Sequence, residues 1–378
     1  MHIVYLTNEY PTQQAAHGGI GTFVQNIARN LVQQQIKVSV VGISLTVSKE
    51  SLTNDKGVQV HRIPQSKAPF GKFIFNSFRI RKKLKEIHKQ TPINIVEGSE
   101  LSFAFLPQKT WYKKVIRMHG GHHFFAVTLN KKPALWRSFQ EKVSFKKADA
   151  LIAVSNFVGE TTQHLLQFKK PYTTIYNFID VSHFNKKCDV EIQPNAILFI
   201  GTICEKKGVK QLIEAFLLVK NNIPNATLHL VGRDWKSEEI PSYTSYIKKR
   251  IPKMYLQDVT FYGTVSYEQI PTLIAQSEVC VYPSHMESFG LTVIEAMATK
   301  KAIVFSDIPP FKEIIRDQKD GLACNPFKPS DIAEKIIFIL TEKKHATAMA
   351  QSAFDAVHQK FNLENSLQEN INFYNSIH

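Results

Sequence analysis

Residues 279–303 read VCVYPSHMESFGLTVIEAMATKKAI and combine three local patterns. The run from Val279 to Tyr282 is short and apolar, which is typical of a buried strand, and a polar turn follows it. From about Gly290 onward the apolar residues recur with helical spacing. Ligands of open α/β sheets bind beyond the carboxyl ends of the strands, so this turn is a candidate binding site.

Two carboxylates bracket the start of the expected helix. Glu287 falls in the turn and Glu295 about one and a half turns inside the helix, so both can face one pocket. The first N–H groups of a helix have no intrahelical partner and favour phosphate or sugar oxygens. Gly290 has no Cβ, which lets a ligand approach the main chain closely. The candidate ligand-binding residues of this segment are Ser288, Phe289, Gly290, Leu291 and Glu295.

The spacing Glu287-x7-Glu295, with Ser-Phe-Gly-Leu inside it, resembles the donor-site signature of the retaining family 4 glycosyltransferases. Pro283-Ser284 before it and Ala-Met-Ala after Glu295 add to the resemblance. The resemblance implies the GT-B fold, an α/β architecture of two Rossmann-like domains that face each other across a cleft. It implies that Glu295 accepts hydrogen bonds from ribose hydroxyls and that Glu287 is catalytic and holds the sugar near its reacting end. A helix with two solvated acids is the alternative.

The length of 378 residues exceeds the roughly 250–300 at which single cores stop growing, which predicts two domains. Short apolar runs alternate with helical patterns in both halves, as in βαβ units around a parallel sheet. We expect an acceptor-side domain over residues 1–185, a polar linker over 186–195 and a nucleotide-sugar donor domain over 196–360. The resemblance implies that residues 361–378 return to the first domain. Strands are expected at 2–7, 37–42, 58–63, 93–97, 114–119, 150–154, 172–176, 196–201, 227–232, 259–262, 279–282 and 302–305.

Cysteine usage and hydropathy predict a cytoplasmic protein. The four cysteines show no C-x-x-C spacing, which indicates reduced thiols rather than a disulfide or metal framework. No apolar run approaches the roughly 20 residues that span a bilayer. The first residues, MHIVYLTNEY, are typical of a strand and not of a signal peptide.

The positive charge is confined to the first half of the chain. Residues 1–190 hold 27 Lys and Arg against 11 Asp and Glu, a net charge of +16, whereas the remainder holds 20 against 21. This asymmetry predicts an anionic partner for the first half: a membrane surface, a phosphorylated acceptor or a nucleic acid.

The segment 67–89 carries eight of these cations and one Glu. Helical spacing predicts that Phe73, Ser77, Ile80, Leu84 and Ile87 pack on the sheet. The opposite face carries aromatic rings among cations, which is typical of a helix that lies on an anionic membrane. A solvated basic face is the alternative. The candidate membrane or acceptor residues are Phe75, Phe78, Arg79, Lys82, Lys83 and, further on, His122.

Two motifs of the first half are candidate parts of the active site. Gly18-Gly19-Ile20-Gly21 follows the first strand and precedes an amphipathic run from Phe23 to Gln35, an arrangement that suits a diphosphate. No G-x-G-x-x-G follows, so NAD is disfavoured, and glycines that only shape a turn are the alternative. The resemblance implies that Gly18 and Gly19 bind the donor.

The second candidate part of the active site is a motif at the end of a strand, Arg117-Met118-His119-Gly120-Gly121-His122-His123. Its histidines lack the acid or the H-x-x-x-H spacing of a metal site, so no metal is expected. The resemblance matches His119 to the family's active-site histidine, beside the transferring sugar. A structural histidine at a strand end is the alternative.

The phosphate side of the donor site is expected at Gly201 to Gly208, GTICEKKG, which follows a strand and opens a helix. It resembles the family's Gly-Arg-Leu-x-x-x-Lys-Gly, which makes Lys207 the phosphate-binding and catalytic lysine. Thr202 stands where the family has arginine, so one positive contact to the diphosphate is missing. The candidate substitutes are Lys206, Arg233 and a residue of the first domain. Thr202, Arg233 and Val265 complete the predicted donor-binding set.

These observations predict a retaining, metal-independent glycosyltransferase without a separate cofactor. It is expected to move a sugar from a UDP- or GDP-sugar to a glycan or lipid-linked acceptor of cell-surface polysaccharide synthesis, at the inner face of the membrane. No Asp-x-Asp occurs, which fits metal independence. The alternatives are a GT-B UDP-sugar 2-epimerase, a sugar-nucleotide binder without turnover and a nucleic-acid-binding scaffold. No RNP, zinc-finger or helix-turn-helix pattern supports the last of these.

Overall fold

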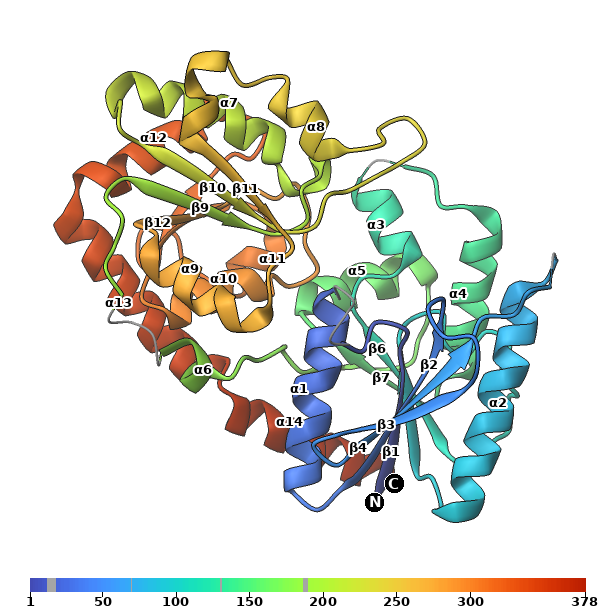
Figure 1. Cartoon of the computed structure of the whole chain (residues 1–378). Helices are drawn as coiled ribbons and strands as arrows, with labels where there is room; N and C mark the ends of the chain where they lie inside the picture. Colours follow the sequence, from blue (N-terminus) through green and yellow to red (C-terminus); the bar gives the residue numbers. More distant parts are fainter. Residues whose placement is uncertain (12–17, 69, 130, 186–189) are drawn as a thin grey trace. The chain divides into compact units, whose positions relative to one another are not determined.

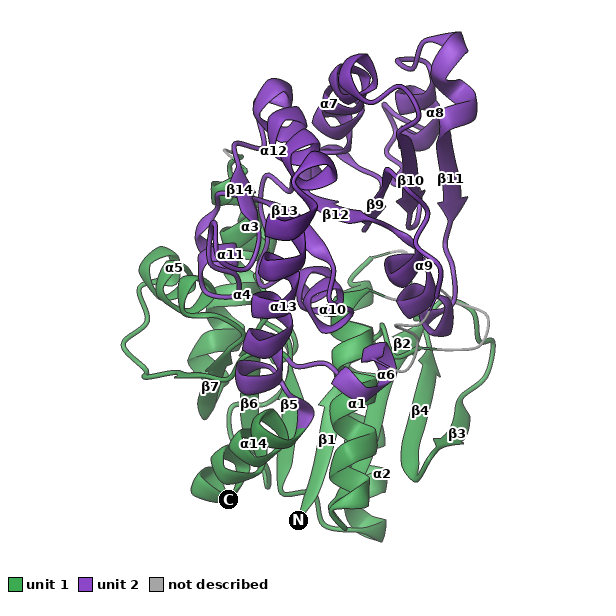
Figure 2. Ribbon diagram, turned by 90° about the vertical axis from the view of Figure 1, so that its left-hand side faces the viewer, with its two compact units in different colours: residues 1–177, 364–378 green, residues 178–363 purple. Residues whose placement is uncertain are grey.

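The chain folds into two compact units, seen here in a computed structural model that describes residues 1–11, 18–68, 70–129, 131–185 and 190–378. Unit 1 comprises residues 1–177 and 364–378, and unit 2 comprises residues 178–363 (Figure 2). The sequence places the boundary at 185 and a linker at 186–195, whereas the units of the structure meet at 177. Residues 186–189 lie outside the described part of the chain.

Unit 1 is built on an eight-stranded sheet in the order β3-β4-β2-β1-β5-β6-β7-β8 (Figure 1). All neighbours are parallel except β3 and β4, which are antiparallel. The strands are β1 (His2–Leu6), β2 (Lys37–Ser44), β3 (Ser51–Asp55), β4 (Val58–Pro64), β5 (Ile95–Gly98), β6 (Lys113–Met118), β7 (Ala150–Ala153) and β8 (Thr173–Thr174). The helices are α1 (Gly19–Gln33), α2 (Lys72–Gln90), α3 (His122–Thr128), α4 (Leu135–Lys147), α5 (Asn156–Leu166) and α14 (Leu363–Ile377).

Unit 2 is built on a six-stranded, all-parallel sheet in the order β11-β10-β9-β12-β13-β14. The strands are β9 (Ala196–Ile200), β10 (Thr227–Val231), β11 (Val259–Gly263), β12 (Val279–Tyr282), β13 (Ala302–Ser306) and β14 (Leu322–Cys324). The helices are α6 (Val181–Asn185), α7 (Val209–Asn222), α8 (Tyr243–Lys248), α9 (Ile270–Gln276), α10 (Leu291–Ala298), α11 (Pro309–Lys312), α12 (Pro329–Thr341) and α13 (Lys343–Lys360). Short 3-10 helices are η1 (Glu205–Lys207), η2 (Lys253–Asp258) and η3 (Tyr267–Gln269).

The central strands are buried along their whole length. Every residue of β1, β9, β12 and β13 is buried, because helices cover both faces of a parallel sheet. Continuous apolar runs are the sequence pattern of such strands, and every strand expected from the sequence is present, although β8 has only two residues. The α/β prediction with two Rossmann-like domains is confirmed at the level of each unit.

Two edge strands, β3 and β14, are not predicted from the sequence. β3 is the polar pentapeptide SLTND and lies antiparallel to β4, joined by a turn in which Lys56 has φ 51° and Gly57 φ 92°. β14 has only three residues. Neither segment has the apolar run or the alternation from which a strand is predicted.

Helix α2 packs on the sheet only through its second half. Leu84 and Ile87 are buried as predicted, and Ser77 and Ile80 are partly buried. Phe73 was expected on the same face, but it is 57% exposed, and the other residues of the first turn of α2 are also exposed. None of the described helices is both long and apolar enough to cross a membrane.

Candidate active site

The predicted donor residues of unit 2 follow four strands that are neighbours in the sheet. Val265 follows β11, Arg233 follows β10, Thr202 follows β9 and Glu287 follows β12. Because the strands are parallel, their carboxyl ends meet at one edge, the edge at which open α/β sheets bind ligands. Val265 is partly buried there, before the capping box of η3.

Two turns of this edge are joined through their backbones. Gly208 has φ 68°, and a Cβ built on it would lie 1.9 Å from the carbonyl oxygen of Pro283, so only glycine fits. The backbone N–H of His285 donates to the carbonyl of Lys206 over 2.9 Å. The turn after β9 therefore lies directly against the turn after β12.

This junction brings Lys207 and Glu287 into contact. The Lys207 ammonium forms an ion pair with Oε1 of Glu287, which also accepts a hydrogen bond from the hydroxyl of Ser284 over 2.9 Å. Burial by itself would raise the pKa of Glu287, but the charges of Lys207 and Lys206 and these hydrogen bonds lower it below its usual value. Glu287 is therefore a carboxylate at neutral pH although it is 8% exposed.

Glu295 lies on α10 in a different environment. Its side chain is 6% exposed, and no described residue donates a hydrogen bond to it. Burial raises the pKa of this carboxyl to about 8. A buried acid without a partner destabilises the fold, so Glu295 can accept hydroxyl donors from a ligand.

The start of α10 is shaped by Gly290, which caps the helix with φ 112°, and a Cβ on it would lie 2.5 Å from the ring of Phe311. The side chain of Phe289 is 1% exposed and its ring lies 5.7 Å from that of Phe361. Phe289 can therefore contact a donor through its backbone only. Ser288 and Leu291 are partly buried on either side.

Arg233 lies beside the residue that replaces the family's arginine. Its Nε donates to the hydroxyl of Thr202 over 3.4 Å, a long hydrogen bond. The guanidinium thus stands next to the position where a positive charge is missing from the sequence motif.

A cavity of about 1080 Å³ lies elsewhere in unit 2, beyond β13 and β14 and between α12 and α13. Its lining includes Asp317, Phe327, Lys335 and Phe338 but none of the predicted donor residues. The ring of Phe327 stacks on His285, 4.5 Å away, so one turn separates this cavity from Glu287.

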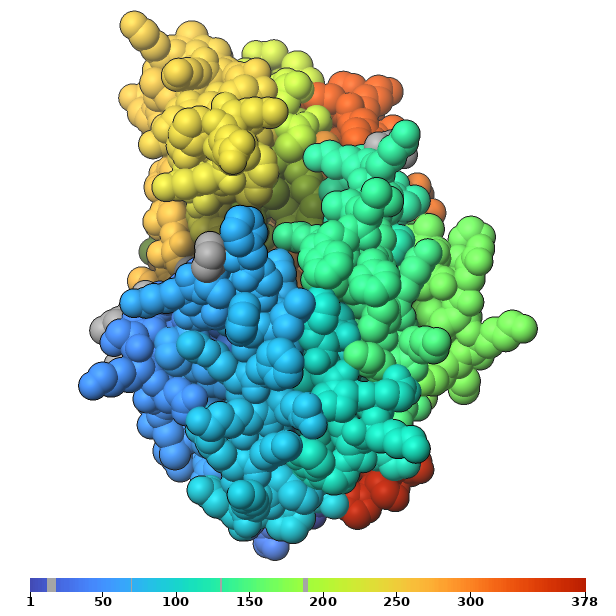
Figure 3. Space-filling view, turned by 90° about the vertical axis from the view of Figure 1, so that its right-hand side faces the viewer, coloured from blue at the N-terminus to red at the C-terminus, as the bar shows by residue number. Residues whose placement is uncertain are grey.

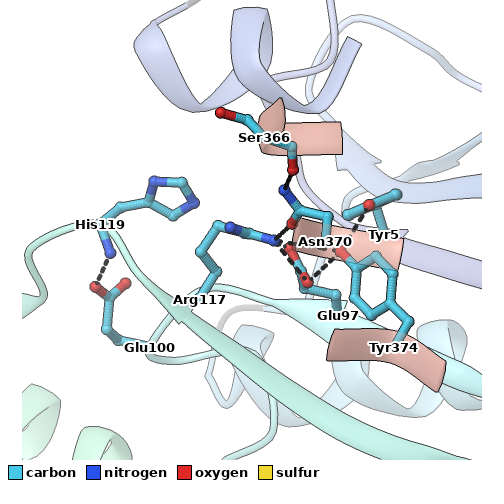
Figure 4. Close-up of polar contacts among 8 residues, drawn as sticks. All are labelled: Tyr5, Glu97, Glu100, Arg117, His119, Ser366, Asn370 and Tyr374. Carbon is cyan, nitrogen blue, oxygen red and sulfur yellow. Dashed lines mark hydrogen bonds and ion pairs between the residues drawn. The ribbon is translucent and has the colours of Figure 1, made fainter. Parts of the chain in front are cut away.

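In unit 1, His119 lies at the carboxyl end of β6 (Figure 4). Its backbone N–H donates to the Glu100 carboxylate over 2.6 Å, and its ring meets that of Phe23 edge-on at 5.8 Å. Burial, and then the charge of Arg117, lower the pKa of His119 to about 3. The imidazole is therefore neutral at physiological pH.

Two buried acids that sequence analysis missed hold the loop after His119. Burial, and then the charge of Glu141, raise the pKa of Glu100 to about 8, although hydrogen bonds from the N–H groups of His119 and Gly120 oppose this. Glu141 accepts from the backbone N–H of His123 at 3.0 Å and contacts its Nδ1 at 2.5 Å. A Cβ on Gly121 would lie 1.8 Å from Oε1 of Glu141. The sequence feature that could have identified Glu100 is its position two residues after the end of β5.

A second buried network supports the strand that carries His119 (Figure 4). Arg117 on β6 donates to Glu97 on β5 over 2.7 Å and to Asn370 on α14 over 2.5 Å. Tyr374 on α14 donates to Glu97 over 2.7 Å and contacts the hydroxyl of Tyr5 at 2.9 Å. The C-terminal helix is thus bound to the rest of unit 1 through buried polar groups.

The glycine motif lies at the start of a helix rather than ahead of it. Gly18 caps α1, which begins at Gly19, four residues before the expected start at Phe23. Residues 12–17, which precede the motif, lie outside the described part of the chain.

The predicted membrane or acceptor residues differ in how exposed their side chains are and in whether those side chains bind other parts of the protein. Phe75 and Phe78 are 50% and 59% exposed, and Lys82 is exposed. Arg79 donates to the carbonyl of Pro64 over 2.6 Å. Lys83 is paired with Glu50 and Glu86 and its side chain is 15% exposed, so it is tied to the protein surface. Nε2 of His122 accepts the backbone N–H of Ala134 over 2.8 Å, which commits that ring to the start of α4.

Within the described ranges, no three His, Cys, Asp or Glu side chains gather so as to hold a metal ion. Cys204, Cys280 and Cys324 are free and buried, and Cys188 falls among the undescribed residues. The donor edge offers cations and buried acids instead.

Family comparisons match both halves of the chain. The family described as Glycosyltransferase Family 4 matches residues 17–183, and Glycosyl transferases group 1 matches residues 184–355. An uncharacterised glycosyltransferase of Methanocaldococcus jannaschii is 23% identical over 334 residues, 86% of each chain. N-acetyl-alpha-D-glucosaminyl L-malate synthase of Bacillus anthracis is 24% identical over 232 residues, which are 59% of this chain and 58% of that one.

Solved structures agree in fold. Sucrose-phosphate synthase of Thermosynechococcus elongatus has a TM-score of 0.81 at 18% identity and covers 100% of this chain and 98% of its own. HepE of Anabaena, solved with UDP and glucose, has a TM-score of 0.75 at 17% identity and full coverage of both chains. The two family matches together take in residues 17–355, and the chain therefore belongs to the group 1 glycosyltransferases of family 4, transferase enzymes with the GT-B fold.

Proposed function

We propose that the chain transfers a sugar from a nucleoside diphosphate sugar, with retention of anomeric configuration and without a metal ion. The observation that carries the proposal is the contact between Lys207 and Glu287 at the edge of the sheet where Glu295 and Arg233 also lie. One edge thus offers cations for a diphosphate and acids for hydroxyl groups.

The mechanism follows from where charge develops. As the bond to the sugar breaks, negative charge grows on the departing diphosphate, and Lys207 and the N–H groups at the start of α10 stabilise it more than in the ground state. Arg233 supplies the second positive charge beside Thr202. Glu295 accepts the ribose hydroxyls and Glu287 holds the sugar. His119 is proposed as a further catalytic residue, whose neutral imidazole offers a hydrogen bond without adding positive charge.

UDP is the proposed nucleotide, with GDP as the second choice. Support comes from HepE of Anabaena, whose fold this chain shares and which was solved with UDP-glucose. The names of two relatives favour transfer over epimerisation. They are N-acetyl-alpha-D-glucosaminyl L-malate synthase and mannosylfructose-phosphate synthase, and each is named for joining a sugar to a second molecule.

The test is thermal unfolding of the purified chain with UDP, GDP and their glucose, N-acetylglucosamine and mannose derivatives. A nucleotide that binds the native state raises the midpoint, by an amount that grows with its concentration over Kd. Lys207→Ala is expected to remove the shift, whereas Lys210→Ala, on the neighbouring helix α7, keeps it. No shift with any of these nucleotides would sink the proposal.

We also propose that the acceptor is a glycan or lipid-linked molecule held at the cytoplasmic face of an anionic membrane, of the kind used in cell-surface polysaccharide synthesis. The support is α2, whose exposed Phe75 and Phe78 lie among cations on the unit that carries the positive charge. Phe75→Ser with Phe78→Ser is expected to weaken binding to vesicles that contain phosphatidylglycerol. Unchanged binding would remove α2 from the proposal.

A further inference from the structure

The first turns of α4 expose three large apolar side chains. Leu135 is 88% exposed, Trp136 51% and Phe139 55%. Positions 135, 136 and 139 fall within about 100° of one another around a helix, so the three side chains share one side. Exposed apolar groups that gather on one side mark an interaction surface.

This group of side chains is held in place. The ring of Trp136 stacks on Phe139 at 5.9 Å with 19° between the planes, and it packs at 5.9 Å against Phe105. The inward side of α4 is fixed by buried Glu141 and Phe145. The rings are therefore presented by a packed helix and not by a loose segment.

The exposed charged residues that neighbour these rings in the described sequence are basic. Lys131, Lys132 and Arg137 flank them, and Lys142 follows on the same helix. The acid of α4 is Glu141, which is fully buried in its contact with His123. An anionic surface thus meets no repulsive carboxylate from α4.

The start of α2 presents the same combination. Phe70 is 87% exposed, Phe73 57% and Ile74 40%, in addition to Phe75 and Phe78. Both helices belong to unit 1, and Figure 3 shows the face on which α2, in blue, and α4, in green, lie. Phe73, which sequence analysis expected in the core, is thereby explained as part of this surface.

We propose that the exposed start of α4 is a second membrane anchor, and that it forms with the start of α2 a two-helix docking surface for an anionic bilayer. Trp136 is the interfacial residue of this surface, because an indole ring has an apolar body and a polar N–H and is favoured where lipid meets water. The inference extends the proposed membrane attachment, but it does not depend on sugar transfer.

A bilayer fits this surface better than a protein partner does. The buried core of a protein interface is depleted of charge, whereas lysines and arginines surround these rings on both helices. Long basic side chains reach anionic headgroups while neighbouring aromatic rings enter the acyl boundary. The net charge of +16 over residues 1–190 supplies the long-range attraction.

A single-tryptophan protein tests the anchor directly. The chain has three tryptophans, Trp111, Trp136 and Trp235, so Trp111→Phe with Trp235→Phe leaves Trp136 as the reporter. With vesicles of phosphatidylcholine and phosphatidylglycerol, the emission of Trp136 is expected to shift to the blue and to be quenched by brominated lipid. An unshifted, unquenched Trp136 overturns the proposal.

Vesicle co-sedimentation supplies the quantitative test. Trp136→Ser with Phe139→Ser is expected to lower the partition coefficient about tenfold, the size expected for removing two interfacial aromatic rings. The matched control is Met254→Ser with Leu256→Ser, exposed apolar residues of unit 2, which are expected to leave partition unchanged. Equal partition of the α4 variant and the wild type overturns the proposal.

Two further measurements separate the outcomes. If the wild type self-associates in analytical ultracentrifugation and Trp136→Ser with Phe139→Ser abolishes this without a change in vesicle binding, the surface joins copies of the chain and the membrane proposal fails. Release of nucleoside diphosphate without vesicles is expected to be the same in the wild type and this variant. Vesicle binding without any turnover would refute the proposed transfer and leave the anchor standing.

Discussion

The ammonium of Lys207 contacts the carboxylate of Glu287 across 80 positions of sequence. The contact exists because β9 and β12 are neighbours in the sheet and Gly208 lets their turns touch. A ligand that approaches this edge meets a neutral pair rather than a bare cation. In the proposed mechanism the diphosphate of a donor competes with Glu287 for the lysine, so the negative charge that grows on the diphosphate during bond cleavage finds a cation already in position.

Replacing Lys207 tests that role. Lys207→Ala is expected to lower kcat about 10²- to 10³-fold, the range for removing one group that stabilises developing charge. The measurement is nucleoside diphosphate release from the donor identified by thermal unfolding, together with circular dichroism to verify the fold. Lys210→Ala is the control and is expected to keep wild-type turnover. A Lys207→Ala enzyme with unchanged kcat would remove the lysine from the mechanism.

Glu295 gives stability a defined pH dependence. Its pKa is about 8 in the folded protein against an ordinary 4.5, because the carboxyl is buried. Between these values the folded state holds a proton that the unfolded state has released, so stability falls as pH rises, by up to about 1.4 kcal/mol per pH unit. Glu295→Gln is expected to flatten this part of the profile in urea unfolding from pH 5 to pH 9. An identical profile in the variant would mean that Glu295 ionises normally.

The same carboxyl links donor binding to proton release. Ribose hydroxyls that donate to Glu295 favour its ionised form, so UDP binding at pH 7 is expected to expel a proton. Isothermal titration calorimetry in two buffers of different ionisation enthalpy measures the number of protons released on binding. Glu295→Gln is expected to abolish the release and Glu295→Ala to abolish transfer. Proton release that persists in Glu295→Gln would assign it to another group.

Much of this architecture was predictable, and the exceptions have physical causes. Residues 279–282 are apolar throughout because both faces of β12 are buried, and that pattern is unambiguous. β3 is polar and lies at a sheet edge, so no hydrophobic periodicity marks it. Phe73 has helical spacing with Leu84, but spacing cannot reveal that only the second half of α2 carries buried side chains. Glu100 and Glu141 stand among ordinary polar residues, and only tertiary contacts bring them to the loop after His119.

Glu100 is expected to position the His119 loop mainly as a neutral acid. Its pKa is about 8, raised by burial and by the charge of Glu141, so near pH 7 it is largely protonated and glutamine is a close mimic. Glu100→Gln is therefore expected to keep kcat within about threefold. Glu100→Ala, which leaves the His119 N–H without its acceptor, is expected to lower kcat more than tenfold, with the about 1–3 kcal/mol cost of an unpaired buried donor. Donor affinity from thermal unfolding is the control, because Glu100 lies in unit 1 and the donor residues of unit 2 remain intact. Equal losses in the two variants would show that the charge of Glu100 matters, not its acceptor oxygen.

The buried pair of Arg117 and Glu97 is expected to carry much of the stability of unit 1. The two side chains are 1% and 3% exposed, and the C-terminal helix adds hydrogen bonds to them through Asn370 and Tyr374. Arg117→Met leaves the Glu97 carboxylate buried without its cation, which is expected to cost about 3–5 kcal/mol in the free energy of unfolding. Lys312→Met removes an ion pair to Asp307 in which both side chains are more than half exposed, and it is expected to cost less than about 1 kcal/mol.

The double variant Arg117→Met with Glu97→Gln distinguishes a buried charge from lost packing. Because glutamine carries no charge but still accepts from Tyr374, the double variant is expected to regain more than half of the stability lost in Arg117→Met. Urea unfolding followed by far-ultraviolet circular dichroism measures all three proteins. A double variant that is no more stable than Arg117→Met would contradict this expectation. The loss of stability would then come from the packing of the guanidinium over Phe23, 4.7 Å away, and the C-terminal helix would be held by side-chain packing rather than by charge.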